Sequence, residues 1–312
     1  MDAIYILSSV GAVTCLIFLV KVVRHLHCYL RPSSLHQCNP LGKESWALVT
    51  GASDGIGLGF AQELCDRGFN VFLHGRNHQK LLRVQEQLKA QWPTSKTKVI
   101  VFDAGKPTEE MSEIVREVGN ANLTVLVNNV GGAIGVIATE YIKLQDMTHQ
   151  QVQDLVSVNA LFPAQLTREL LPILQKNAPS VILNMSSAAA HGLPWLSVYG
   201  ATKGFVGTFS TALNAEMRAG GHQVEVIGVI VGSVKSPGNA HVDEGFFIPS
   251  SRTMARSALE RVGCGRSQLW TYWRHRLQGF VFEWLPERLL QLVFIKRVRI
   301  LIARRDEKQK PA

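Results

Sequence analysis

The middle of the chain, from Glu44 onward, alternates short apolar runs with longer stretches in which apolar residues recur every three or four positions. The apolar runs are rich in β-branched residues, which is typical of buried strands. They predict strands at 46–50, 70–74, 98–102, 123–128, 180–184 and 224–231. The amphipathic stretches predict helices at 56–67, 79–91, 109–118, 147–174 and 197–219. This alternation predicts an α/β fold, with a doubly wound parallel sheet and helices on both faces.

The N-terminus departs from this pattern because residues 3–20 carry no charge. In a helix this run would reach about 27 Å, close to the thickness of a thin bilayer core. Asp2 precedes the run and no small-residue cleavage site follows it. We therefore expect an uncleaved membrane anchor at 1–24, with a signal peptide or a buried hairpin as alternatives. Lys21 and Arg24 follow the run, and this positive flank predicts a catalytic domain on the cytosolic side.

The rest of the chain divides where its composition changes. Residues 25–43 contain two prolines and a glycine and predict a linker. We expect the catalytic domain at 44–275 and a separate C-terminal segment with a basic tail at 276–312. The apolar pattern of that segment is interrupted at Pro286, which argues against a second membrane span. It favours an amphipathic helix that lies on the membrane or over the substrate entrance.

Basic residues gather near both ends of the chain and give it a net charge of +9. No zinc-finger, ribonucleoprotein or helix-turn-helix pattern accompanies them, so we exclude nucleic acid as a partner. Basic residues beside an apolar segment instead favour an anionic membrane surface, and the slightly positive mean hydropathy agrees with this. Lys308 and Lys310 resemble the dilysine retrieval signal of endoplasmic-reticulum membrane proteins. We therefore expect a single-pass protein of that membrane.

The overall composition is that of a globular domain, because hydrophobic residues make up 46% of the chain and charged residues 18%. The five cysteines are odd in number and show no Cys-x-x-Cys spacing. They are Cys15, Cys28, Cys38, Cys65 and Cys264. This pattern predicts neither a disulfide framework nor a metal site, and it suits a reducing compartment.

A glycine-rich loop follows the first predicted strand and opens the first helix of the domain. Glycines in this position allow a sharp turn and let the backbone approach a pyrophosphate, while the helix N-terminus favours its negative charge. The loop therefore predicts a Rossmann-type dinucleotide site. The residues that we assign to it are Gly51, Ser53, Asp54, Gly55, Ile56 and Gly57.

The end of the next strand indicates which dinucleotide binds. An NAD-selective site carries an acidic residue there, whereas this chain offers Arg76, which can pair with a 2′-phosphate. We therefore predict NADP(H). Asp103 can accept a hydrogen bond from the adenine amine, and Asn129 lies where the backbone comes close to the adenosine. We assign Val234 to the cofactor site as well.

The candidate catalytic residues begin with Tyr199 and Lys203, which are one helical turn apart. A tyrosine is a weak acid near neutral pH, with an ordinary pKa of about 10. The lysine charge favours the phenolate and so makes Tyr199 a better proton donor to a ketone oxygen. Lys203 would also hold the ribose hydroxyls. Ser186 and Ser187 end a strand just before this helix, so that a serine hydroxyl can hydrogen-bond the substrate carbonyl. Asn159 can anchor a water that relays protons to Lys203.

These motifs together resemble the short-chain dehydrogenase/reductase family over residues 44–240. The resemblance implies a catalytic tetrad of Asn159, Ser187, Tyr199 and Lys203. Family members usually place the serine thirteen residues before the tyrosine, which points to Ser186, whereas the Asn-x-Ser-Ser strand end points to Ser187. We choose Ser187 and keep Ser186 as the alternative.

The Asn-Asn-Val-Gly variant at 128–131, the anchor and the lysine tail resemble one branch of that family. It contains the 17β-hydroxysteroid dehydrogenases of types 3 and 12 and the microsomal very-long-chain 3-oxoacyl-CoA reductases. The resemblance implies NADPH-dependent reduction of a lipophilic ketone, with a long-chain 3-ketoacyl-CoA as the first choice. A 17-ketosteroid and a polyketide or terpenoid intermediate are the enzymatic alternatives, and a membrane scaffold that kept the fold is the non-enzymatic one. The intact tetrad argues against the scaffold.

The partners that we expect are therefore a lipophilic small molecule and the membrane, with a homo-oligomer or a lipid-elongation complex left open. The segment 236–275, where the family recognises substrates, contains no diagnostic motif. Candidate pocket residues are His191, Trp195, Phe246 and Phe247.

Overall fold

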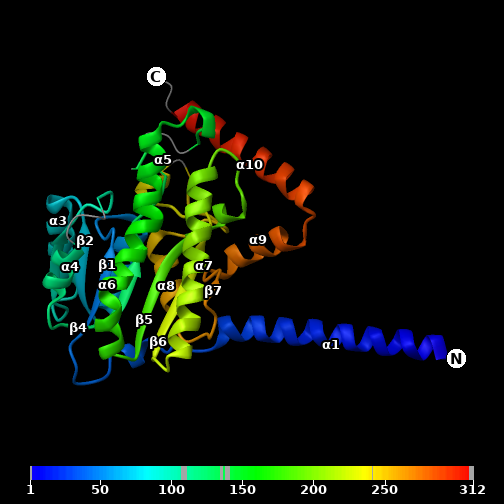
Figure 1. Cartoon of the computed structure of the whole chain (residues 1–312), viewed down its shortest axis with the longest axis horizontal. Coiled ribbons are helices and arrows are strands. Elements are labelled where there is room, and N and C mark those ends of the chain that lie inside the picture. The colour runs from blue at the N-terminus through cyan, green and yellow to red at the C-terminus, as the bar shows by residue number, and fades with distance from the viewer. Residues whose placement is uncertain (1, 107–110, 134–135, 138–140, 241, 309–312) are drawn as a thin grey trace.

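A seven-stranded parallel sheet forms the centre of the molecule in this computed structural model (Figure 1). The structure describes residues 2–106, 111–133, 136–137, 141–240 and 242–308. The strands are β1 (Ser45–Thr50), β2 (Asn70–Gly75), β3 (Thr97–Val101), β4 (Asn122–Asn128), β5 (Ser180–Ser187), β6 (Val224–Val231) and β7 (Gln268–Leu269). Their order is β3-β2-β1-β4-β5-β6-β7, and each neighbouring pair is parallel. The predicted doubly wound sheet is confirmed, and the strand order reverses between β1 and β4, where such sheets bind their ligands.

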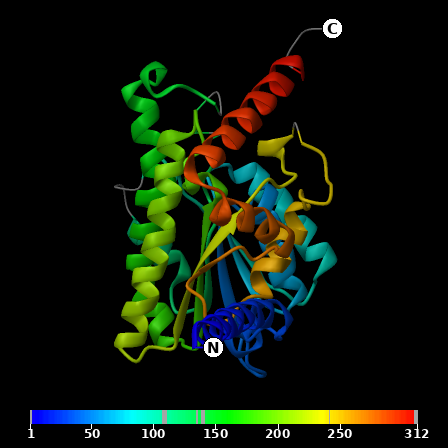
Figure 2. The same cartoon turned by 90° about the vertical axis from the view of Figure 1, so that its right-hand side faces the viewer.

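Helices cover both faces of the sheet (Figures 1 and 2). They are α1 (Asp2–Leu30), α2 (Gly55–Asp66), α3 (His78–Gln91), α4 (Met111–Val118), α5 (His149–Val156), α6 (Phe162–Lys176), α7 (Ser197–Ala219), α8 (Ser251–Leu259), α9 (Trp273–Trp284) and α10 (Glu287–Lys308). Short helical turns join some of them: η1 (Leu35–Cys38), η2 (Leu144–Asp146), η3 (Ser157–Leu161), η4 (Ala188–His191) and η5 (Pro237–Asn239).

The two largest clusters of buried apolar residues in the described part of the chain lie on opposite faces of the sheet, because side chains alternate along each strand. On β2, Val71 and Leu73 pack with the apolar sides of α2, α3 and α8. Phe72, between them, packs with α4, α6 and α7 on the other face. Both layers contain fully buried aromatic residues, among them Phe60 and Phe162. The apolar runs are therefore buried on both faces, as expected for a parallel sheet.

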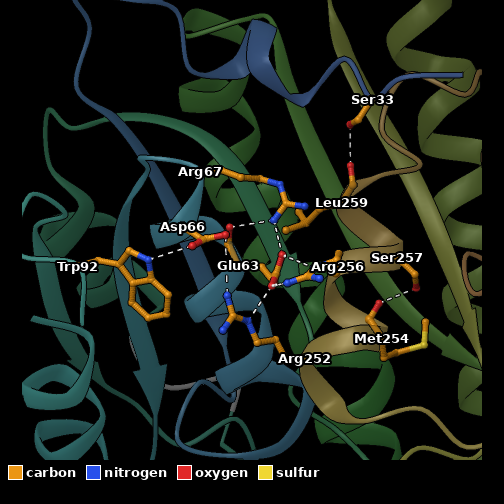
Figure 3. A network of polar contacts seen from close by, with 10 residues as sticks. All are labelled: Ser33, Glu63, Asp66, Arg67, Trp92, Arg252, Met254, Arg256, Ser257 and Leu259. Carbon is orange, nitrogen blue, oxygen red and sulfur yellow. Dashed lines mark hydrogen bonds and ion pairs between the residues drawn. The ribbon is translucent and has the colours of Figure 1, made fainter. Parts of the chain in front are cut away.

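A network of ion pairs attaches α8 to α2, the helix that begins at the glycine loop (Figure 3). The carboxylate of Glu63 in α2 is only 1% exposed and is surrounded by three arginines. Arg252 Nε donates to it at 2.7 Å and Arg256 Nη2 at 2.9 Å, both from α8. Arg67, the residue that follows α2, donates to it as well. The network fixes α2 against α8 and so holds the N-terminus of α2 in place.

The long helix predicted at 147–174 is interrupted by a π-helical turn, η3, between α5 and α6. Several other bounds also differ from the prediction. Strand β5 runs three residues further than expected, to Ser187, whereas β7, α8 and the separate α9 were not predicted. The start of the helix predicted at 109 falls outside the described residues, and α4 is described from Met111.

The N-terminal helix α1 projects away from the domain (Figure 1). Its large apolar side chains are exposed, for example Leu7 at 77% and Phe18 at 54%. No helix in the described part of the chain is long and apolar enough to cross a membrane, so the predicted spanning anchor is not supported. The chain after α1 returns to the domain, where Leu35 and Cys38 are buried in the core.

The C-terminal segment forms two helices, α9 and α10, which separate near Pro286, where the sequence predicted an interruption. Their apolar side chains are largely solvent-exposed, including Trp284 at 67% and Leu292 at 62%. Of the dilysine-like tail, Lys308 is the last residue of α10, and Lys310 lies outside the described residues.

Candidate active site

Hydrogen bonds join the ends of β1 and β4 at the carboxyl edge of the sheet. The hydroxyl of Thr50 accepts from the backbone N–H of Asn129 at 2.9 Å and of Val130 at 3.0 Å, and it donates to the carbonyl of Val127 at 3.1 Å. The Asn129 side chain donates to the carbonyl of Thr50 at 3.0 Å. The structure thus brings Asn129, a predicted cofactor residue, to the glycine loop, where its amide supports the turn.

The glycine loop has the shape that a pyrophosphate requires. Gly51 and Gly55 have φ of +66° and +56°, a region that favours glycine. A Cβ on Gly57 would lie 2.0 Å from the carbonyl oxygen of Gly51, so only glycine lets α2 start this close to the loop. Because α2 begins at Gly55, the N–H groups of its first turn point toward the loop. These features fit a dinucleotide phosphate.

The other residues assigned to the cofactor lie around this loop. Ser53 and Ile56 are half-buried, Asp54 is exposed, and Val234 is buried. Arg76 follows β2 and is exposed at the same edge of the sheet. Asp103 follows β3, next to β2, and its carboxylate accepts from the N–H of Gly105 at 2.9 Å. Arg76 and Asp103 therefore lie on neighbouring strand ends, on the side expected for the adenosine.

Lys203 is buried at the centre of the candidate site, with 5% of its surface exposed. Its Nζ donates to the carbonyl of Met185 at 2.8 Å and lies 5.7 Å from the centre of the Tyr199 ring. Burial lowers the pKa of Lys203 to about 8 because a buried ammonium loses hydration. The predicted Tyr–Lys pair is thus one turn apart on α7, with the lysine charge close to the phenol.

The π-helical turn η3 carries Asn159, and single π-turns are frequent at functional sites. The Asn159 amide accepts from the N–H of Gly132 at 2.8 Å and donates to the carbonyls of Gly132 and Leu155, each at 3.0 Å. A Cβ on Gly131 would lie 2.6 Å from Asn159 Oδ1 and 3.2 Å from Lys203 Nζ. The structure therefore brings Asn159 next to Lys203, with the loop after β4 between them. The predicted water relay stays a prediction.

The two candidate serines point to opposite faces of β5, as neighbours on a strand do. The Ser186 hydroxyl is buried and donates to the carbonyl of Lys203 at 2.8 Å, so it attaches the strand to α7. The Ser187 side chain is half-buried at the strand end and accepts from the N–H of Ala189 at 3.1 Å. Of the two hydroxyls, that of Ser186 is buried and bonded to α7, whereas Ser187 is partly exposed at the strand end. The choice of Ser187 as the catalytic serine stays a prediction.

Apolar side chains surround Tyr199, which is half-buried. Ala189, Leu196 and other residues from η4, α5 and the loop after β4 form a small cluster against it. Such surroundings suit a lipophilic ketone. Of the predicted pocket residues, Trp195 has φ of +61°, and His191 stacks on Trp270 with ring centres 5.9 Å apart.

His275 is a residue of this region that the sequence did not reveal. It is buried in α9, and its Nδ1 accepts from the N–H of Gly232 at 3.2 Å. Its Nε2 therefore carries the proton and faces the carbonyls of Ser233 and Phe247, each at 3.1 Å. Burial lowers the pKa of His275 and so favours this neutral form. One side chain thereby attaches the loop after β6, with the exposed Phe246 and Phe247, to α9.

Comparison with known proteins agrees with this geometry. The family described as short chain dehydrogenase matches residues 45–245. The chain is 34% identical to a very-long-chain 3-oxoacyl-CoA reductase of Anas platyrhynchos, with 84% of this chain and 83% of that protein covered. It is 30% identical to the enzyme of that name from Pyricularia oryzae, with 89% and 84% covered. It is 29% identical to putative steroid dehydrogenase 1 of Caenorhabditis elegans, with 92% and 91% covered.

Solved structures share the fold at lower sequence identity. A 7β-hydroxysteroid dehydrogenase superposes with a TM-score of 0.71 at 18% identity, covering 80% of this chain and 96% of that one. A short-chain dehydrogenase from Sphingobium yanoikuyae in complex with NADPH gives 0.62 at 24% identity, covering 76% and 92%. The family match, the relatives and the fold confirm what the motifs predicted: this chain belongs to the short-chain dehydrogenase family of oxidoreductases.

Proposed function

We propose that this protein reduces the 3-keto group of a long-chain acyl-CoA to a hydroxyl group. The observation that carries the proposal is the placement of Tyr199, Lys203 and Ser187 at the carboxyl edge of the sheet, beside an apolar cluster. Relatives that cover most of the chain are named very-long-chain 3-oxoacyl-CoA reductase, which supports this substrate class.

The cofactor in this proposal is NADP(H). The loop at Gly51–Gly57 fits a pyrophosphate, and Arg76 stands where NAD-selective sites carry an acidic residue. A solved structure of the same fold holds NADPH, which supports the choice. When bound, the cofactor supplies the hydride that reduces the carbonyl carbon.

The protein contributes the proton and the electrostatic environment. Ser187 donates a hydrogen bond to the ketone oxygen and orients it toward Tyr199. The Tyr199 hydroxyl transfers its proton to that oxygen as the C=O π bond breaks, which leaves an alcohol and a phenolate. The buried Lys203 ammonium stabilises the phenolate, and this attraction is stronger than in water because the surroundings exclude solvent.

The substrate test offers the full-length protein in membranes a long-chain 3-ketoacyl-CoA and a 17-ketosteroid, each with NADPH. We expect oxidation of NADPH with the acyl-CoA, and a rate at least about 100-fold lower with the Tyr199→Phe variant, which keeps the ring but has no proton to transfer. Turnover of neither substrate would contradict the proposal.

A steroid ketone is the second candidate. Two Caenorhabditis elegans relatives at 29% and 28% identity are named putative steroid dehydrogenases, and their alignments cover 92% of this chain. The half-buried, apolar surroundings of Tyr199 also suit a rigid polycyclic ketone. Tyr199-dependent turnover of the steroid alone would favour this candidate.

We propose further that the protein associates with the cytosolic face of the endoplasmic-reticulum membrane. The exposed apolar side chains of α1, α9 and α10 support this, together with basic residues on α10. Such helices bind a bilayer surface through buried apolar area and attraction to anionic lipids. Sedimentation with microsomes tests the association, and protease protection tests which side the domain faces. The homo-oligomer and the elongation complex stay predictions.

A further inference from the structure

A cavity of about 410 Å³ lies beside the β7 edge of the sheet, between α7, α9 and the end of α1. We name it the β7 cavity. Its volume falls within the range of small-molecule sites. Helix α7 contributes Gly204 and Thr208, and the chain at and after β7 contributes Leu269 and Trp270. None of these side chains has a role in the proton transfer described above.

One end of the β7 cavity reaches the candidate active site. Ser187, at the end of β5, lines it together with Ala190 and His191 of the following turn η4. A ligand in the cavity can therefore extend to the residue that orients the ketone.

The other end is formed by the last residues of α1. Cys28 and Tyr29 line it, and hydrogen bonds fix them to the domain. The Tyr29 hydroxyl donates to the carbonyl of Trp270 at 2.5 Å, and Arg261 donates to the carbonyl of Cys28 at 2.8 Å. Helix α1 leaves the domain from this point with exposed apolar side chains, among them Leu26 at 51%. The cavity thus joins an apolar surface to the catalytic serine.

Part of the cavity wall is apolar and suits a hydrocarbon chain. Ile230, Leu269 and Trp270 are apolar. The Arg276 guanidinium at the wall pairs with the Glu283 carboxylate, with Nη2 and Oε2 2.9 Å apart, so their charges offset each other. Polar side chains line the cavity as well, among them Arg266, whose Nε donates to Cys28 Sγ at 3.2 Å at the α1 end.

We propose that the β7 cavity holds the acyl chain of the substrate, with the keto group at Ser187 and the chain directed toward Tyr29 and α1. This inference rests on the proposed function and adds to it the location of the chain. If the proposal holds, the β7 cavity determines which acyl-chain lengths the enzyme prefers.

Gly204 offers a direct test because a Cβ built on it meets nothing within 4 Å. The first atom of a new side chain therefore has open space, and the Gly204→Leu variant adds a branched apolar group at this position of the cavity wall. We expect kcat/KM for 3-ketohexadecanoyl-CoA to fall by at least about tenfold, the factor that the loss of two buried methylenes accounts for. Acetoacetyl-CoA, which has no long chain, should keep its kcat/KM within about twofold. The matched control is Ala215→Leu, which adds a leucine at an exposed position of the same helix.

An equal loss with both thioesters would overturn the proposal, because it would place the CoA moiety or the reacting group in the cavity. Unchanged kinetics with both would overturn it as well. The melting temperature of Gly204→Leu shows that the variant is folded, and Gly204→Ala, with only one added methyl, should give an intermediate loss.

A second readout does not depend on turnover. A fatty acyl-CoA with a diazirine at its chain end is photolysed with the protein, and the labelled peptide is identified by mass spectrometry. We expect label on the peptides of Tyr29 or Trp270, whereas label confined to 242–250 would overturn the inference. If the wild type is labelled in the cavity but reduces no 3-ketoacyl-CoA, the proposed function fails and the chain site stands. If the wild type reduces the substrate but is not labelled at Tyr29 or Trp270, the proposed function stands and only the assignment of the acyl-chain site is wrong.

Discussion

Replacement of Glu63 by glutamine tests the energetics of the α2–α8 contact. Burial of the carboxyl acts to raise its pKa, but hydrogen bonds from Arg256, Arg67 and Arg252 outweigh burial and lower the pKa of Glu63 to about 2. The ordinary value is 4.5, and each pKa unit corresponds to about 1.4 kcal/mol, so the ionised form stabilises the fold by up to about 3 kcal/mol. The arginines are 29% to 51% exposed, and solvent screening reduces this to about 2 kcal/mol.

Urea unfolding of the full chain, followed by tryptophan fluorescence, measures this contribution. We expect Glu63→Gln to lower the free energy of unfolding by about 2 kcal/mol at neutral pH. The matched control is Glu117→Gln, which removes an exposed pair with Lys98 and should change it by less than about 0.5 kcal/mol.

The direction of the pKa shift determines how the contribution of Glu63 to stability changes with pH. Because the folded-state pKa of Glu63 is lowered, its contribution is fully present above pH 4.5 and is lost as the pH falls from 4.5 toward 2. The difference between wild type and Glu63→Gln should therefore shrink as the pH falls below 4.5. A difference that stays the same at neutral and acidic pH would refute this reasoning.

Three further predictions concern the site. Ser187→Ala should lower kcat by about 100-fold through loss of a hydrogen-bond donor to the ketone, whereas Ser186→Ala should keep kcat and lower the free energy of unfolding by about 1 kcal/mol. Enzyme kinetics and urea unfolding of both variants measure these effects. The reverse pattern would assign the catalytic role to Ser186. Arg76→Ala should reduce the preference for NADPH over NADH by about tenfold, and an unchanged ratio of kcat/KM values would contradict that assignment. Since burial lowers the pKa of Lys203 to about 8, reduction should slow as the pH rises through 8 and the ammonium is lost; a kcat that stays constant above that pH would contradict the role of Lys203.

The strands at the centre of the sheet were predictable because their signal is local. Strand β6 has the predicted bounds, and α7 runs over 197–219 as predicted, since hydrophobic periodicity and flanking glycines mark both. Strand β7 was missed because it has only two residues and forms through pairing with Gly228 and Val229. Its position depends on the edge of a sheet that is already formed.

The site shows the same division between local and long-range information. The Tyr199–Lys203 spacing is a property of one helix and could be read from the sequence. The choice between Ser186 and Ser187 depends on how the strand is oriented in the sheet, because neighbouring residues of a strand point to opposite faces of the sheet. The contact of Tyr29 with Trp270 joins residues 241 positions apart, and no pattern in either segment indicates it. The β7 cavity was therefore unpredictable from the sequence alone.

The central claim is that Tyr199 donates the proton in the reduction of a long-chain 3-ketoacyl-CoA. The most direct measurement is the formation of 3-hydroxyacyl-CoA from NADPH and 3-ketohexadecanoyl-CoA, followed by mass spectrometry with wild type and Tyr199→Phe. We predict product with the wild type and a rate lower by at least about 100-fold with the variant, the range of general acid catalysis. Equal product formation by both proteins, or none by the wild type, would contradict the account.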